Sequence, residues 1–182
     1  KISALLGLPD RIQIKLFQSS SLNQIAPYIG LQQLAQFPDT LEKIVARLNQ
    51  KNYNKLAFEF FDPTVDESLA ADVKKYKLMT VKWPALDKGT ILPGNGAIGM
   101  VMTFGERSIV VPLLQVIKIP IIGTQYKLME VAEVEEQINR NIEALIDIKP
   151  FSDPSPSRTV AIAWRKHYPR KEAIYTIRDT IQ

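Results

Sequence analysis

The stretch Lys55-Leu-Ala-Phe-Glu-Phe-Phe61, followed directly by Asp62-Pro63, decides how this chain is expected to fold. Leu56, Phe58 and Phe60 alternate with the residues between them, which is the two-residue period of a β-strand. The Asp-Pro pair ends the strand because proline has no N–H to donate to a ladder. The fold class depends on which elements precede and follow this strand.

The residues before this strand predict a second strand and a helix. Apolar residues alternate over 12–17, as in a half-buried strand, and a stripe with i, i+3, i+4, i+7 spacing over 40–50 predicts an amphipathic helix. Asp39 has the position of an N-cap in a capping box. Residues 28–37 are expected to add helix in front, with Pro38 as the break between the two.

The residues after the strand complete a mixed α/β pattern. The sequence predicts, in order, a helix over 66–76, a strand over 79–83, an exposed loop over 84–96, a hairpin of strands 98–104 and 108–113, and a helix over 131–146. Strands that alternate with helices favour a parallel pair, and the hairpin adds antiparallel strands. This order predicts a thioredoxin-like mixed sheet flanked by helices.

The end of the chain differs from the rest. Three prolines follow Ile148 within a few residues, so 148–158 is expected to be an extended connector. A strand over 159–164 and a helix over 170–181 would then form a C-terminal strand–helix appendage. The predicted domains are the α/β domain 1–147, the Pro-rich connector 148–158 and the appendage 159–182.

Composition narrows the chemistry that this chain can perform. The 182 residues include no cysteine and a single histidine, His167, which excludes disulfides, thiolate nucleophiles and most imidazole catalysis. The net charge of +4 lies entirely after residue 147, since residues 1–147 hold 16 basic and 16 acidic side chains. A neutral body offers no broad basic face to nucleic acid.

No apolar run reaches the roughly 20 residues of a membrane span. Because the chain opens with Lys1, any signal peptide or anchor is expected outside it.

Ser19, Ser20 and Ser21 stand where the first strand ends, the position at which thioredoxin-like folds display their reactive pair. A serine nucleophile needs a neighbouring base, and the only histidine lies in the predicted appendage. These serines are therefore interpreted as loop and cap residues, with hydrogen bonding to a ligand or partner as the alternative. A Ser/Thr-dependent hydrolase is the weakest of the functions considered.

Two further motifs have ordinary structural explanations. The glycines from Gly94 to Gly99, which enclose Asn95, match the letters of a dinucleotide fingerprint but lack the preceding strand and following helix, so we interpret them as a turn. Asp62 and Asp66 are interpreted as turn and helix caps rather than ligands of a hard cation. The sequence predicts no catalytic residue, no cofactor and no metal site, and Asn95 is a candidate partner contact.

Aromatic and basic residues alternate from Trp164 to Lys171, which includes Arg165 and Arg170. Such a pattern can stack on bases or bind phosphates. Its small extent favours a solvated corner between a strand and a helix, with His167 at the surface. Arg165 and Arg170 are kept as candidate ligand or partner contacts.

Three features follow one another along residues 5–147: the strand ending in Asp62-Pro63, the glycine-bearing hairpin from Gly99 to Leu113, and a closing helix with Glu135-x-x-Ile. In this order they resemble the soluble domain of the auxiliary component of gliding-motility-type ABC transport systems. The resemblance implies a non-enzymatic, extracytoplasmic or periplasmic domain, anchored to the membrane by helices absent here. Its expected partners are membrane transporter subunits or an exported polymer, with a homo-oligomer as a further option.

Residues 149–182, with Arg158 to Arg170 as the most similar part, resemble the C-terminal end of the effector-binding domain of LysR-type transcription regulators. The cysteine pair of the peroxide-sensing branch and the helix-turn-helix have no counterpart here. This resemblance implies the alternative function, a regulatory domain that binds a small-molecule effector.

Overall fold

The computed structural model of this protein describes residues 10–120 and 123–146. The chain divides into two compact units, Lys1–Ile148 and Lys149–Gln182, and every described residue belongs to the first. The second unit lies outside the described residues, so the predicted connector and strand–helix appendage stay predictions.

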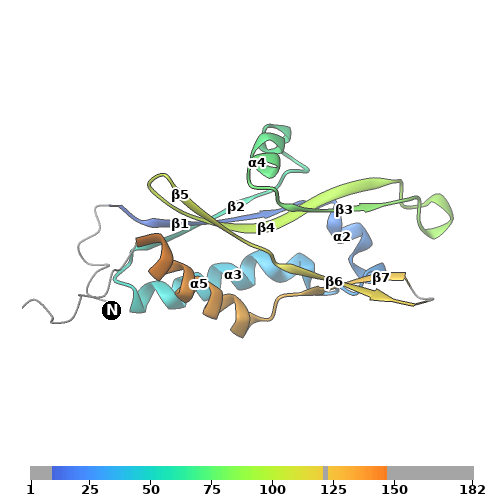
Figure 1. The fold of residues 1–182 in the computed structure, drawn as a ribbon. Helices are drawn as coiled ribbons and strands as arrows, with labels where there is room; N and C mark the ends of the chain where they lie inside the picture. The colour runs from blue at the N-terminus through green and yellow to red at the C-terminus, as the bar shows by residue number, and fades with distance from the viewer. Residues whose placement is uncertain (1–9, 121–122, 147–182) are drawn as a thin grey trace, which may run out of the picture. The chain divides into compact units, whose positions relative to one another are not determined.

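β1 (Ile12–Gln18) lies between a parallel and an antiparallel neighbour, which makes the sheet mixed (Figure 1). β2 (Leu56–Phe61) is the parallel neighbour, with Ile12 opposite Leu56, and β4 (Gly94–Phe104) is the antiparallel one. The opposite edge of β4 pairs with β3 (Met79–Trp83) along its first half and with β5 (Arg107–Val111) along its second half. The strand order is therefore β2-β1-β4, followed by β3 and β5 end to end.

Helices cover both faces of this sheet (Figure 1). α3 (Phe37–Lys51) connects the parallel strands β1 and β2, and α5 (Val131–Ile146) packs beside it on the same face. The short helix α4 (Ala70–Lys75) covers the other face, and the four-residue helix α2 (Leu22–Ile25) follows β1. A parallel pair, an antiparallel hairpin and helices on both faces confirm the predicted α/β class, a mixed sheet flanked by helices.

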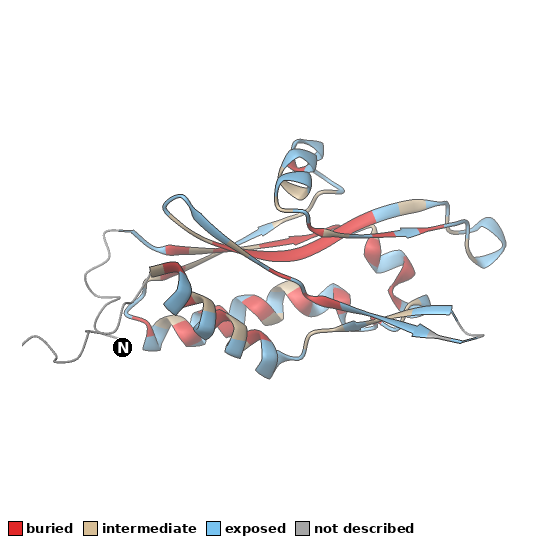
Figure 2. Ribbon diagram, in the orientation of Figure 1, coloured by how far each residue is buried: buried red, intermediate tan, exposed pale blue. Residues whose placement is uncertain are grey.

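The main core lies between the sheet and the pair α3 and α5 (Figure 2). The alternating residues Ile12, Ile14 and Leu16 of β1 are completely buried there, because a strand sends every second side chain to the same face. A smaller cluster, made of Phe17, Leu69, Leu78 and Val101, fills the space between the sheet and α4. The predicted two-residue period of β1 and the helical stripes of α3 and α5 are therefore confirmed.

The predicted start of α3 is wrong. The helix begins at Phe37, with Gln36 at the N-cap, so Pro38 lies in its first turn and Asp39 is a first-turn residue rather than the cap. Proline fits this place because the first N–H groups of a helix have no partner within it. The helix expected over 28–37 is reduced to two single 3₁₀ turns, Ala26–Tyr28 and Leu34–Gln36.

The glycine-rich segment after residue 93 is part of β4 rather than a turn, which corrects the predicted loop over 84–96. Gly96 pairs with Val81 of β3, and a Cβ at Gly96 would lie 2.6 Å from Cγ of Leu22. A Cβ at Gly94 would likewise lie 2.7 Å from the indole ring of Trp83. Glycine is required here because neighbouring side chains lie directly against the strand backbone.

The sequence did not predict the two-stranded hairpin of β6 (Leu114–Ile119) and β7 (Gly123–Leu128), which forms a separate small sheet.

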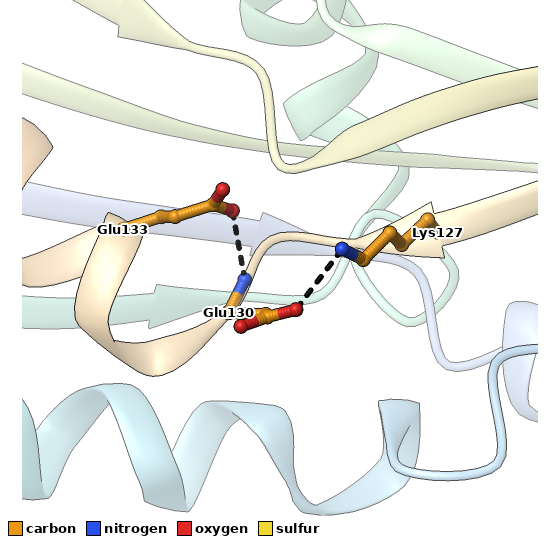
Figure 3. Close-up of polar contacts among 3 residues, drawn as sticks. All are labelled: Lys127, Glu130 and Glu133. Carbon is orange, nitrogen blue, oxygen red and sulfur yellow. Dashed lines mark hydrogen bonds and ion pairs between the residues drawn. The ribbon is translucent and has the colours of Figure 1, made fainter.

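Figure 3 shows how β7 connects to α5. Lys127 Nζ lies 3.0 Å from the carboxylate of Glu130, and the Glu130 N–H donates to the Glu133 carboxylate at 3.2 Å. The hydrogen bond to Glu130, together with the charge of that carboxylate, raises the pKa of Lys127.

Candidate functional site

The candidate site lies where the parallel strands β1 and β2 end side by side. Ser19–Ser21 follow β1, and Asp62–Thr64 follow β2. The Ser20 N–H donates to Oδ1 of Asp62 at 3.0 Å, and the Ser21 N–H donates to Oγ1 of Thr64 at 3.1 Å. Ligands of α/β sheets commonly bind at this edge, because the carboxyl ends of parallel strands meet there.

Asp62 acts as a structural cap for this edge. Its Oδ1 also accepts the Thr64 N–H at 2.8 Å, which closes a turn directly after β2. Partial burial raises the pKa of Asp62, but the hydrogen bonds from Ser20 and Thr64 outweigh it and hold the pKa below the ordinary 3.8. Asp66 likewise caps the 3₁₀ turn Glu67–Leu69 through the Ser68 N–H. These contacts confirm the prediction that both aspartates are caps.

The hydroxyl groups of the site form a chain that ends on a backbone carbonyl. The Thr64 hydroxyl donates to Oγ of Ser21 at 3.2 Å, and the Ser21 hydroxyl donates to the carbonyl oxygen of Asn95 at 3.1 Å. The buried Ser19 extends the ladder between β1 and β4, since its Oγ accepts the Ala97 N–H at 3.0 Å. A carbonyl oxygen cannot take a proton from serine, so this arrangement orients Ser21 without activating it as a nucleophile.

A hollow of about 540 Å³ opens beside these hydroxyls, between the strand ends and α4. This volume falls in the range of small-ligand pockets, roughly 300–1,000 Å³. Residues from both sides of the sheet edge and from α4 line it: Ser19, Ser21, Pro63, Thr64, Ala70, Val73, Lys74, Lys77, Leu78, Thr80, Asn95 and Ala97.

Three of the six residues singled out in the sequence lie together in this lining, namely Ser19, Ser21 and Asn95. Ser20 is next to the hollow, with its N–H bound to Asp62, but it does not line it. Arg165 and Arg170 lie outside the described residues. The structure therefore brings the serines and Asn95 together through the pairing of β1 with β4.

Sequence reasoning missed the two lysines of the hollow, Lys74 and Lys77. They lie at the end of α4, where the N–H of Lys77 bonds to the carbonyl of Lys74 and the N–H of Leu78 bonds to the carbonyl of Val73. These two bonds make a Schellman motif, with Lys77 in the left-handed conformation at φ +50°. Glycine is the usual residue at such a position, so the sequence carries no signal for this turn.

Within residues 10–120 and 123–146, no group of three or more carboxylate or imidazole side chains lies close enough together to hold a metal ion. None of the helices in the described part of the chain combines the length and apolar character that a membrane span requires. Comparison of this chain with protein-family models, with curated proteins and with solved structures finds no match.

Proposed function

We propose that this chain is a non-enzymatic binding and assembly domain of an ABC-type transport system. It would act outside the cytoplasm, as the soluble domain of a protein that is anchored to the membrane by segments outside this chain. Its partners would be membrane transporter subunits or an exported polymer. The proposal is supported by the order of features along residues 5–147 and by the geometry at the end of β1.

The observation that carries the proposal is the way in which the hydroxyl groups at the sheet edge are hydrogen-bonded. Ser21 stands at the reactive position of a thioredoxin-like frame, yet its proton is directed at the carbonyl oxygen of Asn95. The carboxylate of Asp62 accepts two backbone N–H groups and holds the strand ends together. The edge is therefore a rigid frame around an open hollow, which suits holding a partner rather than transforming a substrate.

Two largely exposed apolar side chains lie close in the sequence to residues that line the hollow. Val65, directly after Thr64, is 80% exposed, and Leu92, in the loop between β3 and β4, is 73% exposed. Val65 follows Thr64 directly and Leu92 precedes Asn95 by three positions, so both side chains are suitable probes for a molecule that contacts this edge. We therefore place the partner contact on the Ser19–Ser21 segment and the loop that leads into Asn95.

Site-specific photo-crosslinking in the producing cell tests this proposal. p-Benzoylphenylalanine at Val65 or at Leu92 is expected to give crosslinks to a membrane subunit of the transporter or to its exported polymer. The same group at Tyr53 is the matched control, because that side chain is 44% exposed and precedes β2, at the opposite end of the strand from Val65. Equal crosslinking from Tyr53, or unchanged export after deletion of the gene, would contradict the proposal.

A further inference from the structure

The charged side chains that line the hollow at the sheet edge are all positive. Lys74 and Lys77 line it, and no acidic side chain does. Both lysines are exposed, and neither forms an ion pair or hydrogen bond through its side chain with another described residue. The carboxylate of Asp62, at the end of β2, already accepts the N–H groups of Ser20 and Thr64. Two ammonium groups without a counter-ion among the described residues therefore stand at the mouth.

The hollow also offers neutral hydrogen-bond donors that are not used within the described part of the protein. The side chains of Asn95 and Thr80 line it, and neither side chain bonds to another described residue. The hydroxyls of Ser21 and Thr64, by contrast, are engaged with each other and with the Asn95 carbonyl. The donors left for a ligand are thus an amide, a hydroxyl and two ammonium groups, a set that matches the acceptor oxygens of an acid group.

The remaining wall is aliphatic. Val73 and Leu78 contribute from the end of α4 and the turn after it, and Ala70, Ala97 and Pro63 complete that side. None of the residues that line the hollow is aromatic, so flat rings and sugar faces find no stacking partner there. A short aliphatic body fits this wall, because burial of CH₂ groups is favourable wherever apolar surface leaves water.

We propose that this hollow binds organic anions that carry an acid group on a short aliphatic body, with Lys74 and Lys77 pairing with the acid. The inference rests on the proposed binding function and names the chemical class that the domain would hold. The acid pairs at the mouth with the two lysines and with the amide of Asn95. The aliphatic part lies against Val73 and Leu78 on the α4 side.

The test is a titration of the full chain, labelled with ¹⁵N, with hexanoate and with hexan-1-ol as its neutral match. Hexanoate is expected to shift the amide signals of Ser21, Thr64 and Asn95, and to bind about tenfold more tightly than hexan-1-ol. Added salt is expected to reduce that difference, because exposed charges are screened.

A pair of double variants assigns the binding to the two lysines. Lys74→Gln with Lys77→Gln is expected to lower hexanoate affinity about tenfold while leaving hexan-1-ol unchanged. Lys75→Gln with Lys82→Gln removes the same charge from α4 and β3 at positions that do not line the hollow, and is expected to keep full affinity. Glutamine and lysine have a similar steric cost at the positive φ of position 77, so the variant is expected to fold. A folding defect would be seen directly in the amide spectrum.

Equal affinity for hexanoate and hexan-1-ol, shifts away from the hollow, or equal losses in both double variants would overturn this inference. A second titration with hexaglutamate separates a free acid from an acidic unit of an exported polymer. Binding of either probe through Lys74 and Lys77 supports the inference. Crosslinks from Val65 without hexanoate binding would refute only the anion site, whereas hexanoate binding with unchanged export would refute only the transport role.

Discussion

The backbone N–H of Ser20 donates a 3.0 Å hydrogen bond to Oδ1 of Asp62, a residue 42 positions further along the chain. This bond joins the ends of the two parallel strands, while the bond from Thr64 to the same oxygen closes the turn after β2. The carboxylate thereby sets the shape of the edge on which the hollow opens.

Replacement of Asp62 by alanine is expected to lower the free energy of unfolding by about 1–2 kcal/mol, because two N–H groups lose a charged acceptor. Asp62→Asn keeps an oxygen at the same place and is expected to lose less than half of that amount. Urea unfolding monitored by circular dichroism measures both variants. Equal losses in the two variants would show that these hydrogen bonds to Oδ1 are not the source of the effect.

The contribution of Asp62 is also expected to depend on pH. Its pKa is lower in the folded protein than the ordinary 3.8, so the unfolded chain binds the proton first as the pH falls. The stabilisation is therefore fully present above about pH 3.8 and is lost as the pH falls through the folded pKa. The difference in unfolding free energy between the unchanged protein and Asp62→Asn should shrink over this interval. A difference that stays constant down to strongly acidic pH contradicts the assignment.

Gly96→Ala is expected to destabilise the protein by about 1–3 kcal/mol, because the added methyl group overlaps the side chain of Leu22. The new group would also lie 3.0 Å from Oγ of Ser21, next to the hollow. Thermal unfolding measures the loss. Gly105→Asn is the control, since a Cβ there meets no other atom within 4 Å and asparagine tolerates φ +58°; its change should stay within about 0.5 kcal/mol.

Phe17→Ala is expected to lower the free energy of unfolding by about 3–5 kcal/mol. Phe17 is 1% exposed and stacks on Phe61 with ring centroids 5.1 Å apart, in the cluster beneath α4. Phe60→Ala removes the same group from a side chain that is 46% exposed, and should lose less than about 1 kcal/mol. Similar losses in both variants would argue against the burial of Phe17 as the cause.

Lys77→Gly is expected to raise the free energy of unfolding by about 0.5–1 kcal/mol, because glycine adopts φ +50° without the steric cost that a Cβ imposes. The same substitution two residues earlier, Lys75→Gly, lies at the end of α4 in the right-handed conformation. It should instead lower stability by about 0.5–1 kcal/mol. Denaturant unfolding of the two variants checks for this opposite sign, and effects of the same sign would contradict the role of φ at Lys77.

The sequence predicts a strand of the main sheet well where that strand has one buried and one less buried face. β1 shows this directly, since its buried residues occur at every second position from Ile12 to Leu16. The hairpin of β6 and β7 was not predicted, because the consecutive apolar residues Val116 and Ile117 are 49% and 42% exposed and the middle of β6 shows no alternation of apolar and polar residues. Its connection also lacks the Asn-Gly or Asp-Gly pair that signals a tight hairpin.

The candidate site is harder to predict, because it depends on the register between strands. Ser19 meets Ala97 only because β1 and β4 pair as they do, and this register places Asn95 beside Ser21. Lys74 and Lys77 depend on a left-handed turn with no glycine to announce it. The alternative of a small-molecule effector domain rests on residues 149–182, outside the described part of the chain, and stays a prediction.

β4 takes part in every antiparallel pairing of the main sheet, with β1 on one edge and β3 and β5 on the other. Its partner β1 is distant in the chain, since the Ser19 to Ala97 bond joins residues 78 positions apart. A nascent chain that stops before Gly94 lacks β4, and with it every antiparallel pairing of the main sheet, so β3 has no partner strand yet. Assembly of this domain is thus a late event in synthesis, governed by long-range contacts and correspondingly slow.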